Sequence, residues 1–287
     1  MHYKEAKKIL SSGNGMNLYR GCTHGCIYCD SRSNCYQMEH PFEDIEVKSN
    51  ALELLEKELR SKRKRCMIGT GSMTDPYIPL ESELGTVRKA MEIIHRYGFG
   101  FTVITKSDLI LRDLDLLKKL NRDTRCVVQM TLTTADESLC RVLEPNVCTT
   151  ARRFEVLKIL RYEGIPTVVW LCPILPFIND TKENIEAVTD MCIEAKVYGI
   201  VNFGMGVTLR EGNREYFYSK LDRHFPGMKE KYILAYGNRY ELESPDAAEL
   251  SAIFQRKCRE NDIICDNNAV FGYLDRFGDD EEQLTLF

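Results

Sequence analysis

One stretch decides what fold and chemistry to expect of this chain: Cys22-Thr23-His24-Gly25-Cys26-Ile27-Tyr28-Cys29. It places three thiols at the spacing C-x-x-x-C-x-x-C, and Gly25 allows the backbone to turn where a side chain would clash. Thiolates are soft ligands that select iron–sulfur clusters, zinc or copper(I). Three thiolates on a cubane cluster leave one iron without a protein ligand. The spacing therefore predicts a metal centre on Cys22, Cys26 and Cys29 with one open position.

The composition is that of an ordinary globular protein. The chain has 287 residues, of which 44% are hydrophobic and 29% charged, and its net charge is −4. This balance gives no overall electrostatic attraction to nucleic acid, so any such contact must come from a local patch. The start of the chain, Met1-His2-Tyr3-Lys4-Glu5, lacks the apolar core of a signal peptide, and no apolar run reaches membrane-spanning length. We expect a cytoplasmic protein with reduced thiols and no membrane contact.

Strand and helix patterns alternate along most of the chain. Apolar runs predict strands at residues 16–20, 66–71, 99–105, 126–133, 166–172 and 198–203. Helical periodicity predicts helices at residues 45–63, 83–97, 112–121, 149–163 and 182–196. This alternation indicates an α/β fold with a parallel sheet, which is compatible with a doubly wound sheet and with a partial or full TIM barrel.

The pattern changes after Gly204. Residues 211–236 and 245–261 are expected to be helical, and 263–266 to form a short strand. We expect a core at residues 1–205, a helical extension packed on it at 206–277, and an acidic then apolar tail at 278–287.

With Tyr28 directly before its last cysteine, the cysteine motif resembles the signature of radical S-adenosylmethionine (radical SAM) enzymes. The resemblance implies a (β/α)6 partial barrel with a 4Fe-4S cluster after the first strand. It also implies that the open iron chelates SAM and that one electron, from a donor such as flavodoxin or ferredoxin, cleaves SAM to a 5′-deoxyadenosyl radical. Tyr28 is expected to pack near the adenine.

The loop after the second strand, residues 69–81, is similar to that of the spore photoproduct lyase-like group. The resemblance implies that Ser72 and Thr74 line the SAM side of the barrel mouth, although Asp75-Pro76 is also ordinary turn punctuation. In that group's lyase, a cysteine near this loop returns a hydrogen atom to the product radical. Here Ser72 or Met73 occupies the position, so the chain departs from the lyase at this point.

Lys106 and Arg153 match further SAM contacts of the family, and Thr131 is a further candidate on the fourth predicted strand. Lys106 is expected to pair with the SAM carboxylate, its alternative being an exposed loop cation. Thr131 offers a hydroxyl to SAM, although threonine is also a common strand residue. Arg153, in the helix after Glu144-Pro145, is expected to point back toward SAM, with a structural ion pair to Glu144 as the alternative.

The substrate is expected, by analogy alone, to be a nucleic-acid lesion, as in DNA repair. Two rival hypotheses are a zinc site, completed by Cys35, His24 or His40, and an iron–sulfur electron carrier or sensor that never cleaves SAM. Trp170 is expected in the core. The end of the chain, Gln283-Leu284-Thr285-Leu286-Phe287, resembles the peptide by which bacterial repair proteins dock on the sliding clamp. The alternative is that its apolar side chains pack on the protein's own surface.

Overall fold

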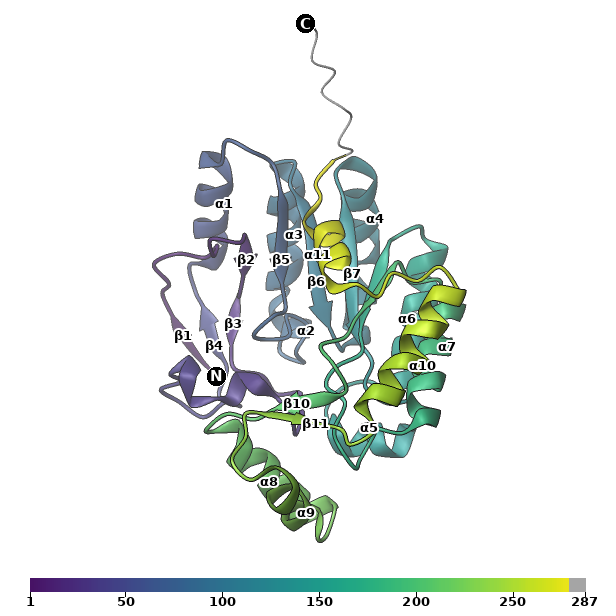
Figure 1. Ribbon diagram of the computed structural model, residues 1–287. Coiled ribbons are helices and arrows are strands. Elements are labelled where there is room, and N and C mark those ends of the chain that lie inside the picture. Colours follow the sequence, from purple (N-terminus) through teal and green to yellow (C-terminus); the bar gives the residue numbers. More distant parts are fainter. Residues whose placement is uncertain (279–287) are drawn as a thin grey trace, which may run out of the picture.

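A six-stranded parallel sheet forms the centre of the computed structural model, which describes residues 1–278 (Figure 1). Its strands are β2 (Gly15–Met16), β5 (Met67–Thr70), β6 (Gly100–Thr105), β7 (Cys126–Thr131), β8 (Thr167–Trp170) and β9 (Gly199–Val201). They lie side by side in chain order, with no reversal. A doubly wound sheet requires such a reversal, so the order selects the partial barrel and confirms the expected fold class.

Helices alternate with these strands as the periodicity predicts. They are α1 (Ala51–Ser61), α3 (Thr86–Arg96), α4 (Leu114–Asp123), α6 (Thr150–Tyr162) and α7 (Lys182–Glu194). In α3 the side chains of Val87, Ala90, Met91 and Ile94 are completely buried, at the spacing of one helix face. Every residue of β7 is buried, because the sheet is covered on both faces.

The expected helix 45–63 is wrong in its first part. Glu46–Lys48 forms strand β4 of a separate three-stranded sheet, between β1 (His2–Lys4) and β3 (Tyr19–Arg20). The expected strand 16–20 is likewise divided, because β2 joins the central sheet and β3 pairs with β4. Helical periodicity is a pattern among neighbouring residues, so it does not show which strands pair with partners that are distant in the chain.

Other boundaries also differ from expectation. The helix expected at 83–97 is interrupted by Gly85, whose φ of 59° ends α2 (Glu81–Leu84). The sequence patterns did not predict α5 (Glu137–Leu143), which begins where the Asp136 side chain accepts hydrogen bonds from the next turn. The helix expected at 211–236 is two helices, α8 (Asn213–His224) and α9 (Met228–Tyr236).

The segment after the last sheet strand returns to the barrel mouth. There β10 (Gly206–Thr208) pairs antiparallel with β11 (Glu241–Glu243), and the α8–α9 hairpin projects beyond them (Figure 1). The helix α10 (Ala247–Glu260) packs on α7, and α11 (Asn267–Asp275) packs against β9. In place of the strand expected at 263–266, Ile264 forms a single bridge to Gly199. We propose that residues 206–277 are an extension of the core, because α10 and α11 bury apolar side chains against it.

Within residues 1–278, every helix is too short or too polar to cross a bilayer. The clamp-like sequence at residues 283–287 lies outside the described residues.

Candidate active site

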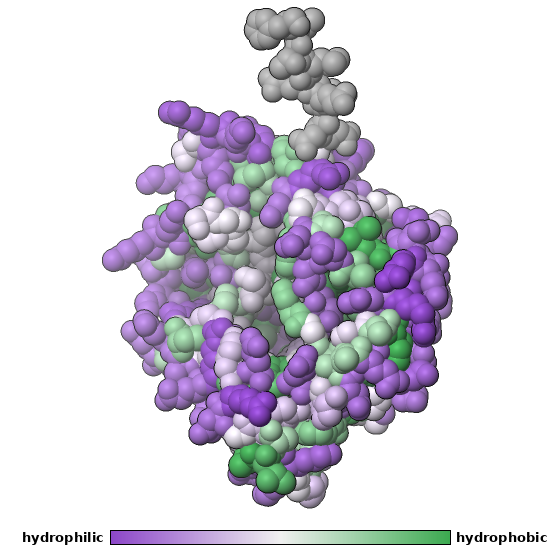
Figure 2. All heavy atoms as spheres, viewed as in Figure 1, coloured by the Kyte–Doolittle hydropathy of each residue, from purple (hydrophilic) through white to green (hydrophobic). Residues whose placement is uncertain are grey.

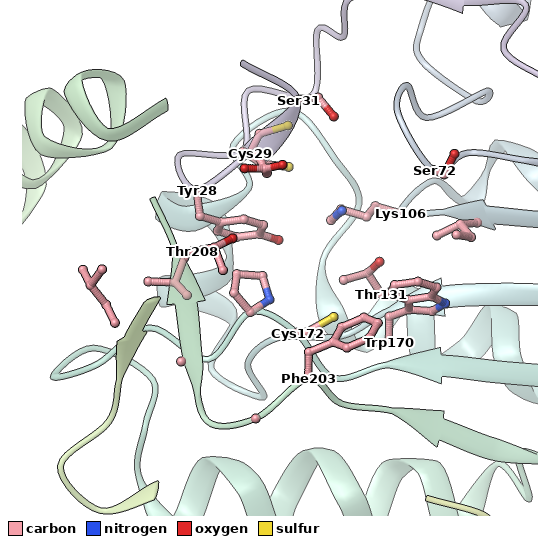
Figure 3. Close-up of a pocket in the computed structure, with 18 of the residues that line it drawn as sticks. Tyr28, Cys29, Ser31, Ser72, Lys106, Thr131, Trp170, Cys172, Phe203 and Thr208 are labelled. Carbon is pink, nitrogen blue, oxygen red and sulfur yellow. The ribbon is translucent and has the colours of Figure 1, made fainter. Parts of the chain in front are cut away.

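A cavity of about 960 Å³ opens where the strands of the central sheet end (Figure 3). Figure 2 shows it as a recess in a mostly hydrophilic face. The cysteine loop contributes Cys22, His24, Cys26, Tyr28 and Cys29 to its lining, and the β10–β11 ribbon contributes Thr208, Glu241 and Glu243. The strand ends and the segments after them contribute Ser72, Met73, Asp75, Lys106, Thr131, Trp170, Cys172 and Phe203. This volume suits a cofactor together with a small substrate. The carboxyl ends of barrel strands are where barrel enzymes place their chemistry.

The cysteine loop is held against the segment around Pro145. The Ile27 amide donates to the Leu143 carbonyl at 3.0 Å, and the Asn146 amide donates to the His24 carbonyl at 3.1 Å. Gly25 has a φ of 73°, and a Cβ there would lie 3.1 Å from the Pro145 ring. A side chain at this position would be strained and crowded. The loop can therefore approach this segment only with glycine at position 25.

Asp75 joins the cysteine loop to the next two strand ends. Its carboxylate lies 3.3 Å from His24 Nδ1 and accepts hydrogen bonds from the Lys106 amide and the Thr105 hydroxyl, both at 2.8 Å. Burial lowers the pKa of His24, but the Asp75 carboxylate outweighs it, and the net pKa is raised to about 10. The pair is thus charged at neutral pH. Asp75 is a half-buried structural acceptor in the cavity wall, a role that its place in an Asp-Pro turn did not reveal.

A second buried network lies beneath Tyr28. Arg153 is fully buried and donates to Glu144 Oε2 at 2.5 Å and to the Thr131 carbonyl at 2.8 Å. The Tyr28 hydroxyl donates to the other oxygen of Glu144. Burial raises the pKa of Glu144, but Arg153 and Lys106 outweigh it and hold that pKa below its usual value. The network fixes Tyr28 and Thr131, which both face the cavity.

Lys106 extends into the cavity between the cysteine loop and the strand ends (Figure 3). Burial lowers its pKa, but the surrounding acidic groups, Cys26 first, outweigh burial and raise it. Its ammonium nitrogen lies 6.0 Å from the centre of the Tyr28 ring. No carboxylate of the described part of the chain lies within 4.0 Å of this nitrogen to form a salt bridge. The cavity therefore contains a cation able to bind an anionic group of a ligand.

The family model of the radical SAM superfamily matches residues 16–216, which span the central sheet and the cysteine loop. This chain belongs to the radical SAM superfamily. Enzymes of this family use a 4Fe-4S cluster and SAM, and these are the cofactors of this protein.

The relatives found by sequence are uncharacterized proteins, so they do not indicate which reaction this chain catalyses. An uncharacterized protein of Mycobacterium tuberculosis is 28% identical over 223 residues, which are 76% of this chain and 65% of the relative. An uncharacterized protein of Methanocaldococcus jannaschii is 30% identical over 177 residues, which are 61% of this chain and 65% of the relative. The chain thus spans about two thirds of the length of these curated relatives.

Solved structures of spore photoproduct lyase have the same fold. One, complexed with dinucleoside spore photoproduct, has a TM-score of 0.65 and 12% identity over 90% of this chain and 78% of the lyase. Another, with bound AdoMet and the same dinucleoside, has a TM-score of 0.61 and 13% identity over 85% and 72% of the two chains. At such low identity the likeness concerns the fold alone.

The residues present fit a radical SAM cluster. Cys22, Cys26 and Cys29 all line the cavity and are free thiols. Among residues 1–278, three ligand atoms come within 4.8 Å of one another only in a group elsewhere, at His2, His40 and Asp44. The three sulfurs thus do not all lie within 4.8 Å of one another, a spacing that fits a cubane, in which each thiolate binds a different iron.

The expected SAM-binding residues divide into two groups. Tyr28, Ser72, Lys106 and Thr131 line the cavity. Thr74 and Arg153 do not: the Thr74 side chain is buried, and the Arg153 guanidinium is directed at Glu144. For Arg153 the structure has the ion pair that was the alternative. This arrangement therefore does not support a direct contact of Thr74 or Arg153 with SAM.

The sequence patterns did not predict the aromatic wall that Trp170 and Phe203 form in the cavity, opposite the cysteine loop (Figure 3). The expectation that Trp170 is a core residue is only partly met. Trp170 packs on a buried hydrophobic cluster, but it is half-buried and also lines the cavity, where its ring lies 5.8 Å from that of Phe203, which is 63% exposed. Phe271 of α11 packs on both rings at 6.1 and 6.2 Å. The Trp170 indole donates to Gln129 Oε1 at 2.8 Å, which fixes its orientation. The available sequence signal was a phenylalanine at the end of the strand expected at residues 198–203.

The cavity contains a thiol outside the cysteine loop. Cys172, after β8, lines the wall beside Phe203 (Figure 3). Burial raises its pKa to about 12, so this thiol is protonated at neutral pH. The sequence analysis expects Ser72 or Met73 where the lyase group has its thiol, and the cavity contains a thiol after another strand, at Cys172.

Proposed function

We propose that this protein cleaves SAM reductively at a 4Fe-4S cluster held by Cys22, Cys26 and Cys29 and directs the resulting radical at a substrate in the same cavity. The cavity's lining supports this most strongly, because it combines three cysteines, a cation and an aromatic wall. When bound, the reduced cluster and SAM supply a 5′-deoxyadenosyl radical. The protein supplies orientation and the exclusion of water.

Several of the cavity residues then have distinct roles in binding SAM. Lys106 binds the SAM carboxylate, since its charge has no protein partner within salt-bridge distance among the described residues. Tyr28 packs near the adenine, and the Ser72 and Thr131 hydroxyls offer hydrogen bonds to SAM. Arg153 acts through Glu144 and Thr131 as a positioning residue.

We propose a nucleic acid with an unstacked or damaged base as the substrate class. Trp170 and Phe203 present ring faces and edges at the cavity, and aromatic side chains bind exposed bases of any sequence by stacking. Arg239 lies at the same rim and offers a charge to phosphate. One solved lyase of the same fold is complexed with dinucleoside spore photoproduct.

SAM cleavage is tested by anaerobic cluster reconstitution followed by incubation with SAM and dithionite. We expect slow release of 5′-deoxyadenosine by the wild type and none by a Cys26→Ala variant. Zinc without labile sulfide would refute the proposal in favour of a zinc protein. A cluster whose spectrum does not respond to SAM would instead indicate an electron carrier or sensor.

The substrate class is tested by fluorescence, because Trp170 is the single tryptophan of the chain. A short single-stranded oligonucleotide should quench this fluorescence, and Phe203→Ala should weaken binding by about 5- to 100-fold, the equivalent of ~1–3 kcal/mol per stacked base. Tyr162→Ala, another highly exposed aromatic, is the control. Equal affinity of Phe203→Ala and wild type would exclude stacking at this wall.

We further propose cytoplasmic partners: a flavodoxin- or ferredoxin-type electron donor, and the sliding clamp through residues 283–287. A glutamine followed by apolar side chains behind an acidic spacer suits weak docking into a preformed groove. A peptide of the last ten residues should bind a bacterial clamp with a Kd of roughly micromolar order. Replacement of Leu286 and Phe287 by alanine should remove binding, and equal binding of both peptides would contradict the proposal.

A further inference from the structure

We propose that His2, His40, Asp44 and Glu46 form a binding site for a divalent transition-metal ion, separate from the cluster. One ligand atom from each of His2, His40 and Asp44 lies within 4.8 Å of the others. All three side chains are half-buried. None of the four residues lines the cavity that contains the cluster cysteines. The site lies instead where strand β1 meets the loop that leads into β4.

The tautomer of His40 makes it a ready metal ligand. His40 Nδ1 lies 3.1 Å from the Pro41 carbonyl oxygen. A carbonyl oxygen can only accept, so Nδ1 carries the proton and Nε2 of the neutral ring presents a lone pair. Nε2 is buried and has no hydrogen-bond partner. Metal-binding histidines commonly donate their second nitrogen to a backbone carbonyl in this way.

Glu46 brings a buried carboxylate to the same point. Its side chain is only 6% exposed, and Oε2 lies 3.8 Å from His40 Nε2 and 3.9 Å from His2 Nε2. These separations are too long for direct hydrogen bonds. Because the ligand atoms that come within 4.8 Å of one another are those of His2, His40 and Asp44, Glu46 contributes a neighbouring buried negative charge that a cation in this group would compensate. Asp44 approaches from the other side, with Oδ2 at 3.0 Å from His2 Nδ1.

Two protein cations also contact the acidic groups. The Met1 ammonium lies 2.6 Å from Oδ1 of Asp44, and Lys4 Nζ lies 3.5 Å from Oε2 of Glu46. Lys4 is 53% exposed and has a second carboxylate, that of Glu39, at 3.7 Å. Lys4 can therefore move away from Glu46 when a metal ion binds and still pair with Glu39. The ammonium group contacts Oδ1 of Asp44, so a metal ion would bind Oδ2 in place of its present contact with His2 Nδ1.

The donor set favours zinc. Imidazole nitrogens suit Zn²⁺, Cu²⁺ and Ni²⁺, whereas Ca²⁺ and Mg²⁺ require mostly oxygen ligands. Two imidazoles with one or two carboxylates can complete the tetrahedral environment of zinc. No thiol belongs to this group, which distinguishes it from the cysteine loop.

The ion would stabilise the segment on which the cysteine loop rests. The Phe42 carbonyl, between His40 and Asp44, accepts a hydrogen bond from the Cys22 amide at 2.9 Å. On the other side, the His2 amide donates to the Ile45 carbonyl at 3.0 Å. A metal that joins His2 to His40 therefore ties β1 to the loop on which Cys22 rests.

Zinc titration of the full-length, untagged protein with its cluster assembled tests the site. A chromophoric zinc chelator supplies the competition. We expect one zinc per chain in the wild type and at least about tenfold weaker binding in His40→Gln. His95→Gln is the matched control, because His95 also pairs with a carboxylate, that of Asp123 at 2.7 Å, but lies on the helical surface. It should bind zinc as the wild type does.

The effect of zinc on folding stability is a second measurement, which can be interpreted even if a variant folds poorly. At 100 times the Kd, zinc should shift the folding equilibrium of the wild type about 100-fold toward the native state, and it should have no such effect on His40→Gln or Asp44→Asn. No zinc-dependent rise in the wild-type melting temperature would overturn the site. Equal zinc affinity in His40→Gln would do the same. Intense thiolate-to-metal charge transfer with Co²⁺ as a substitute would also overturn it, since that ion would lie on cysteines.

Discussion

Replacing Lys106 by alanine tests the central electrostatic feature of the SAM site. Lys106 is half-buried, and the neighbouring acidic groups raise its pKa, so it is charged at neutral pH. A hydrogen bond to a charged group contributes roughly 1.5–3 kcal/mol, and each ~1.4 kcal/mol is a factor of ten. We therefore expect Lys106→Ala to raise the Kd for SAM by about 10- to 100-fold. Lys106→Arg, which keeps the charge, should raise it less.

The assay must separate SAM binding from cluster assembly. Lys106 lowers the pKa of Cys26 and Cys29, which burial raises, so its loss also disfavours the thiolates that bind iron. Iron and sulfide are measured first, and SAM is then titrated into the oxidised, cluster-loaded protein with calorimetric detection. Lys158→Ala is the control, since Lys158 is 46% exposed and pairs with Glu194 on the outer helices. A change below about twofold in Lys106→Ala at full iron content would refute the assignment.

Two further predictions concern the cluster and its support. Cys26→Ala should lose the cluster, whereas Cys172→Ala should retain about four irons and four sulfides, and an equal loss in both variants would show that Cys172 is a ligand. Asp75→Asn should lower the free energy of unfolding of the cluster-free protein by roughly 3 kcal/mol at neutral pH, because it breaks a buried pair with His24. Since His24 and the backbone donors outweigh burial and lower the pKa of Asp75, the advantage of the wild type should vanish as the pH falls through that lowered value. It should be full between the usual pKa values of aspartate and histidine and decline as the pH rises toward the His24 pKa of about 10. Urea denaturation at several pH values measures this, and a difference independent of pH would contradict it.

Local patterns in the sequence were sufficient for the type of fold. The spacing of the cysteine motif indicated the cofactors, and alternating periodicities indicated the helices and strands of the barrel. These features follow from short-range physics, since helix faces repeat every three or four residues and a tight loop can gather neighbouring thiols. Lys106 could also be expected at the mouth, because carboxyl ends of parallel strands meet at one edge.

Only the tertiary structure decided which distant groups meet. Arg153 turned inward because Glu144 and the Thr131 carbonyl offer partners that compensate for burying its charge. Trp170 became part of a cavity wall because α11, much later in the chain, brings Phe271 against it. The sequence by itself determined the cysteine motif and the alternation of elements. The long-range pairings that build the walls, the buried ion pairs and the histidine cluster have no local period, so they emerge only when the chain is folded.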